Sequence, residues 1–135
     1  MKLSVQSQRV MSVDIELTVT FTLGDKCDYG IQIEGMIEGM IEVYSGDELV
    51  DVADQDSYGR LAPLLGPTVG RAVTHAEADD SGRLFLSFDN GIRLRVPSDE
   101  SYEAWNVTGP DGYLIVSQPG GGLAIWSAGS DSSSK

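Results

Sequence analysis

Cysteine and histidine are almost absent from this sequence of 135 residues, which has one of each, Cys27 and His75. A single cysteine excludes an internal disulfide, and two such residues cannot build the clustered ligand sets that transition metals prefer. Nucleophilic catalysis usually needs a histidine beside the nucleophile. The aspartates around Cys27 oppose formation of its thiolate. We therefore expect no enzyme, no metal and no cofactor.

Basic residues are also scarce. Nine lysines and arginines stand against 21 aspartates and glutamates, so the formal net charge is −12. Nucleic acids and anionic membranes are bound through cationic side chains, so neither is an expected partner. A surface of this charge attracts cationic partners and speeds their encounter. The same acidity also keeps a protein soluble, and this simpler interpretation stays open.

Long hydrophobic runs are lacking. No stretch is long enough to cross a bilayer, and the first ten residues alternate polar and apolar side chains instead of forming a secretory signal. We therefore expect a cytoplasmic protein. Its length fits one globular domain, residues 1–126. The remaining segment, 127–135, is small and polar, and is expected to be a disordered tail.

The dominant pattern is alternation of apolar and polar residues, which is typical of half-buried strands. It continues from Val13 to Leu23 without a break and predicts one strand there, followed by a turn at 24–28. Further strands are predicted at 29–33, 36–44, 48–52, 68–78, 84–88, 92–96, 104–107, 113–117 and 123–126. Asn90-Gly91 predicts a tight hairpin between two of them. Trp105 and Trp126 lie in such strands and are expected in the core.

Only one segment indicates a helix. Residues 54–57 offer N-cap side chains, and Leu61, Leu64 and Leu65 fall on one helical face. Gly66-Pro67 is expected to end the helix. The predicted fold class is α+β, mainly antiparallel β, with two hairpin-rich halves, one short helix between them, and a sandwich or strongly bent sheet as the architecture. A weak repeat, in which Arg71-Ala72-Val73 echoes Arg9-Val10, is what two similar halves would produce, and any two amphipathic hairpins would produce it as well.

The second half carries distinctive short motifs: Glu103-Ala104-Trp105, then Gly109-Pro110-Asp111-Gly112, then Pro119-Gly120-Gly121-Gly122-Leu123-Ala124-Ile125-Trp126. This ending resembles a family of small, uncharacterised bacterial proteins that is common in actinobacteria. The resemblance brings no assigned activity. In size, charge and style the chain also resembles immunity proteins encoded beside polymorphic or contact-dependent toxins, which implies a cytoplasmic protein that binds a toxin and occludes its active site.

Two alternatives to an immunity protein stay open: a small acidic structural or regulatory binding module, and a small-ligand-binding β protein. The expected partner is a protein toxin with a cationic surface, and the chain alone is expected to be a monomer or weak dimer. Candidate partner-binding residues form two acidic stretches. The first comprises Asp47, Glu48, Asp51, Asp54 and Asp56, and the second comprises Asp99, Glu100, Tyr102 and Glu103.

Overall fold

The computed structural model describes residue 3 and residues 8–24, 32–109 and 113–126. The predicted turn at 24–28, with Cys27, lies almost wholly outside the described residues. The same holds for the middle of the Gly-Pro-Asp-Gly motif, for the start of the strand predicted at 29–33 and for the tail predicted at 127–135.

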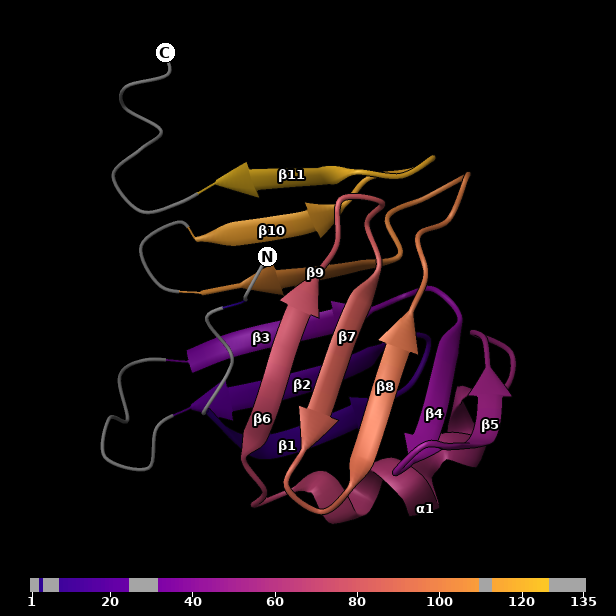
Figure 1. Cartoon of the computed structure of the whole chain (residues 1–135), viewed down its shortest axis with the longest axis vertical. Coiled ribbons are helices and arrows are strands. Elements are labelled where there is room, and N and C mark those ends of the chain that lie inside the picture. Colours follow the sequence, from indigo (N-terminus) through magenta and orange to yellow (C-terminus); the bar gives the residue numbers. More distant parts are fainter. Residues whose placement is uncertain (1–2, 4–7, 25–31, 110–112, 127–135) are drawn as a thin grey trace.

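The described chain forms two antiparallel sheets packed face to face (Figure 1). In spatial order, the six-stranded sheet contains β1 (Arg9–Ile15), β2 (Val19–Gly24), β3 (Gln32–Ile37), β9 (Trp105–Thr108), β10 (Leu114–Ser117) and β11 (Leu123–Trp126). The five-stranded sheet contains β5 (Glu48–Ala53), β4 (Ile41–Ser45), β8 (Ile92–Val96), β7 (Leu84–Phe88) and β6 (Val73–Ala78). The predicted fold class is confirmed.

The two sheets do not correspond to the two halves of the sequence. Each half begins with a three-stranded meander, β1–β2–β3 or β6–β7–β8. The strands that follow each meander cross to the opposite sheet, so that β4 pairs with β8 and β9 pairs with β3. Arg9, the first residue of one echoing segment, and Ala72, the second residue of the other, form an isolated bridge. The two halves therefore have similar topology, and the strands after each meander join the sheet that contains the other half's meander.

The single strand predicted from Val13 to Leu23 is wrong. The structure has a hairpin there, in which the Glu16 amide donates to the Thr18 carbonyl at 2.9 Å and Ile15 pairs with Val19. Leu17 stands at its tip and is 76% exposed. The alternation of apolar and polar residues continues through the turn because Ile15 and Val19 pair directly and both side chains face the core.

The single strand predicted at 36–44 is also wrong. β3 ends at Ile37 and β4 begins at Ile41 in the other sheet. The amides of Glu38 and Gly39 both donate to the Ala104 carbonyl, at 2.8 and 2.9 Å. A side chain at Gly39 would place its Cβ 2.9 Å from that of Ala104. The glycine therefore permits the close approach at which the chain changes sheets.

The predicted helix is present but short. It consists of the 3₁₀ turn η1 (Tyr58–Leu61), α1 (Ala62–Leu65) and the 3₁₀ turn η2 (Gly66–Thr68). Gly66-Pro67 does not end it, because a helical turn tolerates proline early, where no amide is required. Of the three leucines predicted to share a helical face, Leu61 and Leu65 are buried and Leu64 is partly buried against the same core. No helix in the described part of the chain is long and apolar enough to span a membrane.

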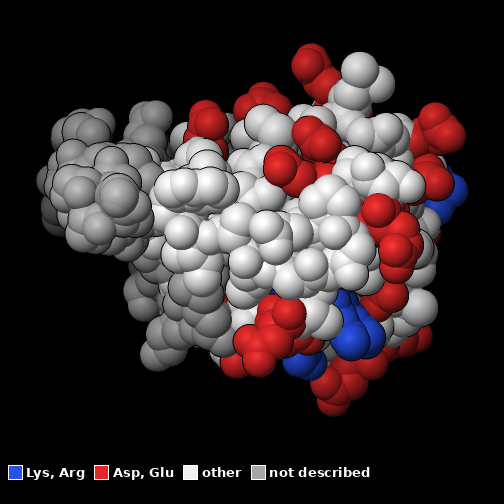
Figure 2. Space-filling model, turned by 90° about the horizontal axis from the view of Figure 1, so that it is seen from above, with Lys and Arg blue, Asp and Glu red and all other residues white. Residues whose placement is uncertain are grey.

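Several connections gather at one end of the molecule, the upper end in Figure 1. Residues 38–39 are bonded to Ala104 at the end of the β8–β9 connection, and the Gly120 amide of the β10–β11 turn donates to the Asp99 carbonyl at 2.7 Å. Figure 2 views this end from above and shows acidic side chains spread widely over it and few basic ones.

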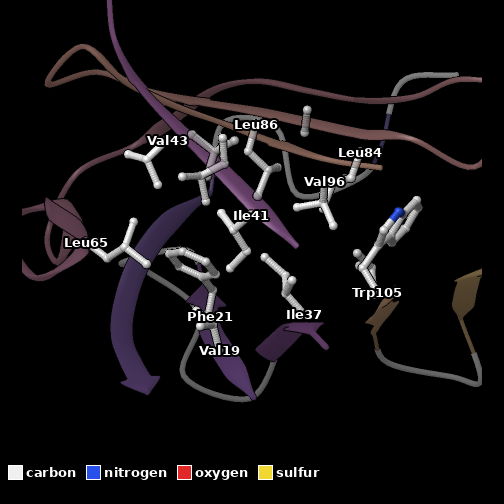
Figure 3. Packing of buried hydrophobic residues seen from close by; sticks show 14 of the residues in the cluster. Val19, Phe21, Ile37, Ile41, Val43, Leu65, Leu84, Leu86, Val96 and Trp105 are labelled. Carbon is white, nitrogen blue, oxygen red and sulfur yellow. The ribbon is translucent and has the colours of Figure 1, made fainter. Parts of the chain in front are cut away.

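The core lies between the sheets and is almost wholly apolar (Figure 3). Phe21 and Phe88 come from opposite sheets and stack with ring centroids 5.6 Å apart. Trp105 is fully buried, as expected. Trp126 was expected in the core but is 46% exposed, because it belongs to an edge strand and projects on the outer face of its sheet, beside Leu114. Burial of this core is the main stabilising contribution to the fold.

Candidate functional site

The first predicted acidic stretch is spread along β5 instead of forming one cluster. Asp47 and Glu48 lie at the β4–β5 turn, whereas Asp54 and Asp56 follow the other end of the strand. Six residues of β-strand separate these ends by about 20 Å. The structure therefore divides this stretch into two regions.

Two members of the stretch already have arginine partners. Arg93 Nη1 lies 2.9 Å from Asp47 Oδ1, and Arg60 Nη2 lies 2.8 Å from Asp51 Oδ1. The hydrogen bond from Arg60 is the largest effect on the pKa of Asp51; it outweighs the opposing effect of burial and holds the pKa below its ordinary value. These carboxylates are less available to a cationic partner than their sequence position suggests.

The second stretch lies in the β8–β9 connection, close to the far end of the first one. Asp54 and Asp99 both raise the pKa of Tyr102, and Asp54 and Tyr102 both raise the pKa of Tyr58. Glu38 also raises the pKa of both tyrosines. The sequence did not identify Glu38 as part of this region, because residues 36–44 resembled one strand. We name this region the acidic corner; it consists of Glu38, Asp54, Asp99, Glu100, Tyr102 and Glu103.

Tyr58 anchors the backbone of the β3–β4 connection, next to Glu38 of the acidic corner. The side chain of Tyr58 is 1% exposed, and its hydroxyl donates to the Gly39 carbonyl. Burial raises the pKa of Tyr58 far above its ordinary value, and the nearby Tyr102, Glu38 and Asp54 raise it further. At Tyr102, partial burial raises the pKa, as do the charge and hydrogen bond of Asp99. Both tyrosines therefore stay protonated at neutral pH beside several carboxylates.

The acidic corner gathers several carboxylates that have no basic partner in the described structure. Among the described residues, none of the corner's carboxylates lies in an ion pair. Several acids of the five-stranded sheet and the adjoining turns do have such partners, since Asp47, Asp51, Asp79 and Asp89 each lie within 4.0 Å of an arginine nitrogen, although Glu48 and Asp80 have none in the described structure. Unbalanced charge gathered at one place costs stability, and such local conflicts are typical of functional sites.

A second feature, not predicted from the sequence, is a groove of about 400 Å³ on the outer face of the five-stranded sheet. Cross-strand pairing places its side chains in two rows. One row runs Tyr44, Arg93, Ser87 and His75, and the other runs Glu42, Arg95, Phe85 and Glu77. Alternation along each strand was visible in the sequence, but the rows depend on strand order, which was not.

The polar groups of this outer groove are mostly bonded to one another. His75 Nε2 lies 3.0 Å from Glu77 Oε1, and the Tyr44 hydroxyl donates to Glu42 Oε1 at 3.0 Å. Arg95 is held less closely: its buried Nε has no hydrogen-bond acceptor among the described residues and lies 3.7 Å from Glu42 Oε1, at ion-pair distance. Ser87 pairs across the strands with His75, yet no hydrogen bond between their side chains occurs in the described structure. The groove offers recognition by an arginine more readily than it offers nucleophilic catalysis.

Metal ligands do not cluster in the part of the chain that the structure describes: no three histidine, cysteine, aspartate or glutamate side chains there are placed to hold one ion.

The chain was then compared with known proteins. Neither a curated protein nor a solved structure matches it. A family model does match, over residues 1–127, and its description is "Family of unknown function (DUF6188)". This match spans nearly the whole chain, which therefore belongs to the DUF6188 family.

Proposed function

We propose that this chain is a cytoplasmic immunity protein, which binds a cognate bacterial toxin and neutralises it by occluding its active site. The acidic corner is the observation that supports the proposal most strongly. It gathers five carboxylates, on Glu38, Asp54, Asp99, Glu100 and Glu103, and none of them lies in an ion pair among the described residues. A cationic partner would relieve the mutual repulsion of these groups, and the free protein would keep them poised for it.

The proposed mechanism is competition for the toxin's own basic residues. Toxins that act on nucleic acid bind it through lysines and arginines, and an acidic protein can cover the same side chains. The net charge of −12 would steer the encounter at long range. Tyr102, which is 37% exposed within the corner, offers a hydroxyl and an aromatic face to an incoming arginine or lysine.

The first experiment tests the immunity function. The chain is co-expressed with the product of the gene adjacent to its own, and the cells are examined for rescue from growth arrest and for a co-purifying complex. The folded His75→Ala variant should rescue equally well, because no catalytic step is proposed. An absence of both rescue and complex with the wild-type chain would leave the regulatory binding module as the better account.

The second experiment tests the electrostatic mechanism within that function. Glu100→Lys with Glu103→Lys reverses two exposed charges whose side chains make no hydrogen bond in the described structure. Asp99 is left unchanged because its Oδ1 accepts the Ser101 amide at 2.8 Å. The double variant should associate with the toxin at least ten times more slowly at low salt, and the difference should shrink as salt screens charges over about 8–10 Å.

The control for this experiment is Asp14→Lys, an exposed charge reversal on β1 at the opposite edge of the six-stranded sheet. It should slow association much less than the double variant does. Equal association rates for all three proteins would keep the immunity function and discard the acidic corner as its contact surface.

The outer groove favours a different function, a small-ligand-binding β protein. The observation in its favour is Arg95 beside a groove of about 400 Å³, since its buried Nε has an ion-pair partner in Glu42 at 3.7 Å but no hydrogen-bond acceptor among the described residues. Arg95→Met keeps an unbranched, flexible but shorter side chain and removes its charge. If this variant lost the rescue while Glu100→Lys with Glu103→Lys kept it, the groove would replace the acidic corner as the functional site.

A further inference from the structure

The edges of the two sheets differ in how well they are protected against pairing with another chain. Natural proteins protect edge strands with charges, prolines, bulges or covering segments. Four strands stand at sheet edges here: β1, β5, β6 and β11. A comparison of these four shows which edge is open to a partner.

Three of the edges carry such devices. Register shifts occur in the pairing of β1, β5 and β6 with their neighbours, and each of these strands has at least one charged residue, Arg9 and Asp14 in β1, Glu48 and Asp51 in β5, and Glu77 in β6. β6 is also covered in part, since the Leu3 amide donates to the Ala76 carbonyl at 2.9 Å.

In the part of the chain that the structure describes, β11 has none of these devices. Its sequence, Leu123-Ala124-Ile125-Trp126, contains no charge and no proline, and its pairing with β10 runs without a register shift. Its side chains are unusually exposed for apolar residues, with Ile125 at 50% and Trp126 at 46%. These two project on opposite faces of the sheet, so a strand added beside β11 would cover both.

The hydrogen-bond register shows which backbone groups of β11 are free to pair. The Gln118 amide donates to the Gly122 carbonyl at 3.0 Å, so these two residues form a hydrogen-bonded pair. Hydrogen-bonded and non-hydrogen-bonded pairs alternate along an antiparallel ladder. Ala124 and Trp126 therefore bond to β10, whereas Leu123 and Ile125 direct their amides and carbonyls away from it.

One end of this open edge adjoins the acidic corner. The Gly120 amide in the β10–β11 turn donates to the Asp99 carbonyl at 2.7 Å. The nearest side-chain atom to a Cβ built on Gly120 is Glu100 Oε2, at 3.9 Å. A partner strand beside β11 would thus continue from apolar contacts at Ile125 toward the Glu100 carboxylate near Gly120.

We propose that β11 binds the toxin by strand addition, a mode that rests on the proposed function. The occupant is an extended segment of the partner. It pairs with the outward backbone groups of Leu123 and Ile125, places apolar side chains on Ile125 and Trp126, and carries lysine or arginine where it passes Glu100. Main-chain bonds contribute affinity in such complexes, and the side-chain pattern selects the partner. This charge complementarity favours a cationic segment over a second copy of this acidic chain.

The decisive variant is Ile125→Pro in the full chain. It removes an outward amide that β10 does not use, and proline is accepted in edge strands at such positions. Ile125→Ala is the matched control, because it shortens the same side chain and keeps the amide. Thermal unfolding of both proteins verifies that they fold. Both are then measured against the toxin and against a phage-displayed library of short random peptides, which needs no toxin.

We expect the library to yield peptides in which β-branched residues alternate with others and basic residues lie at one end. Ile125→Pro should weaken their binding, and that of the toxin, at least tenfold relative to Ile125→Ala. Hydrogen exchange should show new protection of the Leu123 and Ile125 amides in either complex.

Two outcomes would overturn the proposal. If Ile125→Pro bound both probes as tightly as Ile125→Ala, with no protection in β11, strand addition would be wrong even where the toxin complex forms. If the wild-type chain formed a dimer by light scattering that Ile125→Pro abolished, the edge would belong to a second copy. Peptide binding that depends on β11, without any toxin complex or rescue, would support the open edge and reject the immunity function.

Discussion

The indole Nε1 of Trp105 donates to the carbonyl oxygen of Gly82 at 2.8 Å, joining the two sheets inside the core. The hydroxyl of Ser117 donates to the same oxygen at 2.9 Å. One backbone carbonyl in the β6–β7 turn therefore anchors both β9 and β10. Because a buried polar group must find a partner, this pair of bonds fixes how the turn docks on the six-stranded sheet.

Replacing Trp105 should destabilise the protein in two measurable steps. Trp105→Ala removes a fully buried side chain and should lower the free energy of unfolding by about 3–5 kcal/mol. Trp105→Phe keeps most of the volume but loses the bond to Gly82, and should cost less. Urea unfolding measures both. The control is Trp126→Ala, a half-exposed position that should cost less than about 1 kcal/mol; equal losses at the two tryptophans would contradict the assigned burial.

Gly82→Ala should be more damaging than the same change at Gly91. Both glycines have a positive φ, +92° and +91°, which disfavours alanine by about 1–2 kcal/mol. At Gly82 the added Cβ would also lie 2.9 Å from the Gly122 carbonyl and 3.0 Å from Ser117 Oγ, whereas at Gly91 it would meet nothing within 4 Å. Urea unfolding of both variants isolates the contribution of close packing. Equal stabilities would show that the turn can move away from β10.

The turn that presents Gly82 should also respond to acid. Burial alone would raise the pKa of Asp79, but hydrogen bonds from Ser81 and Arg83, together with the charge of Arg83, lower it below its ordinary value. The ionised form is therefore favoured by folding, and this contribution is present above the unfolded pKa of about 3.9 and lost as pH falls through the lower folded value.

Asp79→Asn tests this dependence. The variant should be less stable than wild type at pH 7, and the difference in the free energy of unfolding should shrink as the pH falls below about 4. Urea unfolding across this pH range measures it. A difference that stayed constant with pH would mean that the carboxylate charge has no part in holding the turn.

Neutralising one acid of the corner should separate stability from binding. Glu38→Gln removes a charge that has no basic partner among the described residues, so at low salt the free energy of unfolding should rise by a few tenths of a kcal/mol. Affinity for the toxin should fall. Glu48→Gln, at the exposed start of β5 far from the corner, is the control and should leave affinity unchanged. A Glu38→Gln protein with lower stability and intact affinity would contradict the site.

Strands were predicted well where alternation ends in a glycine or proline, as at Leu84–Phe88 and Ile92–Val96 around Asn90-Gly91. Prediction failed where the turn has no such residue. The chain reverses direction at Glu16-Leu17-Thr18 without interrupting the alternation of apolar and polar residues, so the alternation does not reveal the turn. At 36–44 a signal was present, since Gly39 interrupts the apolar run. One glycine alone, however, does not distinguish a crossing between two sheets from a bulge within one strand.

The candidate site was predictable only in part, because its members come from three connections that meet through long-range packing. The β8–β9 acids were identified from composition alone. Their proximity to Asp54 and Glu38 depends on the pairing of β4 with β8 and of β3 with β9, which no local pattern specifies. The openness of β11 likewise follows from its place at the end of the sheet. Its apolar sequence by itself predicted a buried strand, which is why Trp126 was assigned to the core.

The order of strands along the chain also determines when each layer can be completed during synthesis. All five strands of one sheet lie between residues 41 and 96, so that layer is available as soon as this segment has left the ribosome. The other layer needs both flanks, and β3 has no neighbour on one side until residues 105–108 emerge. Of the described strands β11 is made last, so a partner that bound it by the proposed strand addition could do so only once the other described strands can already have folded.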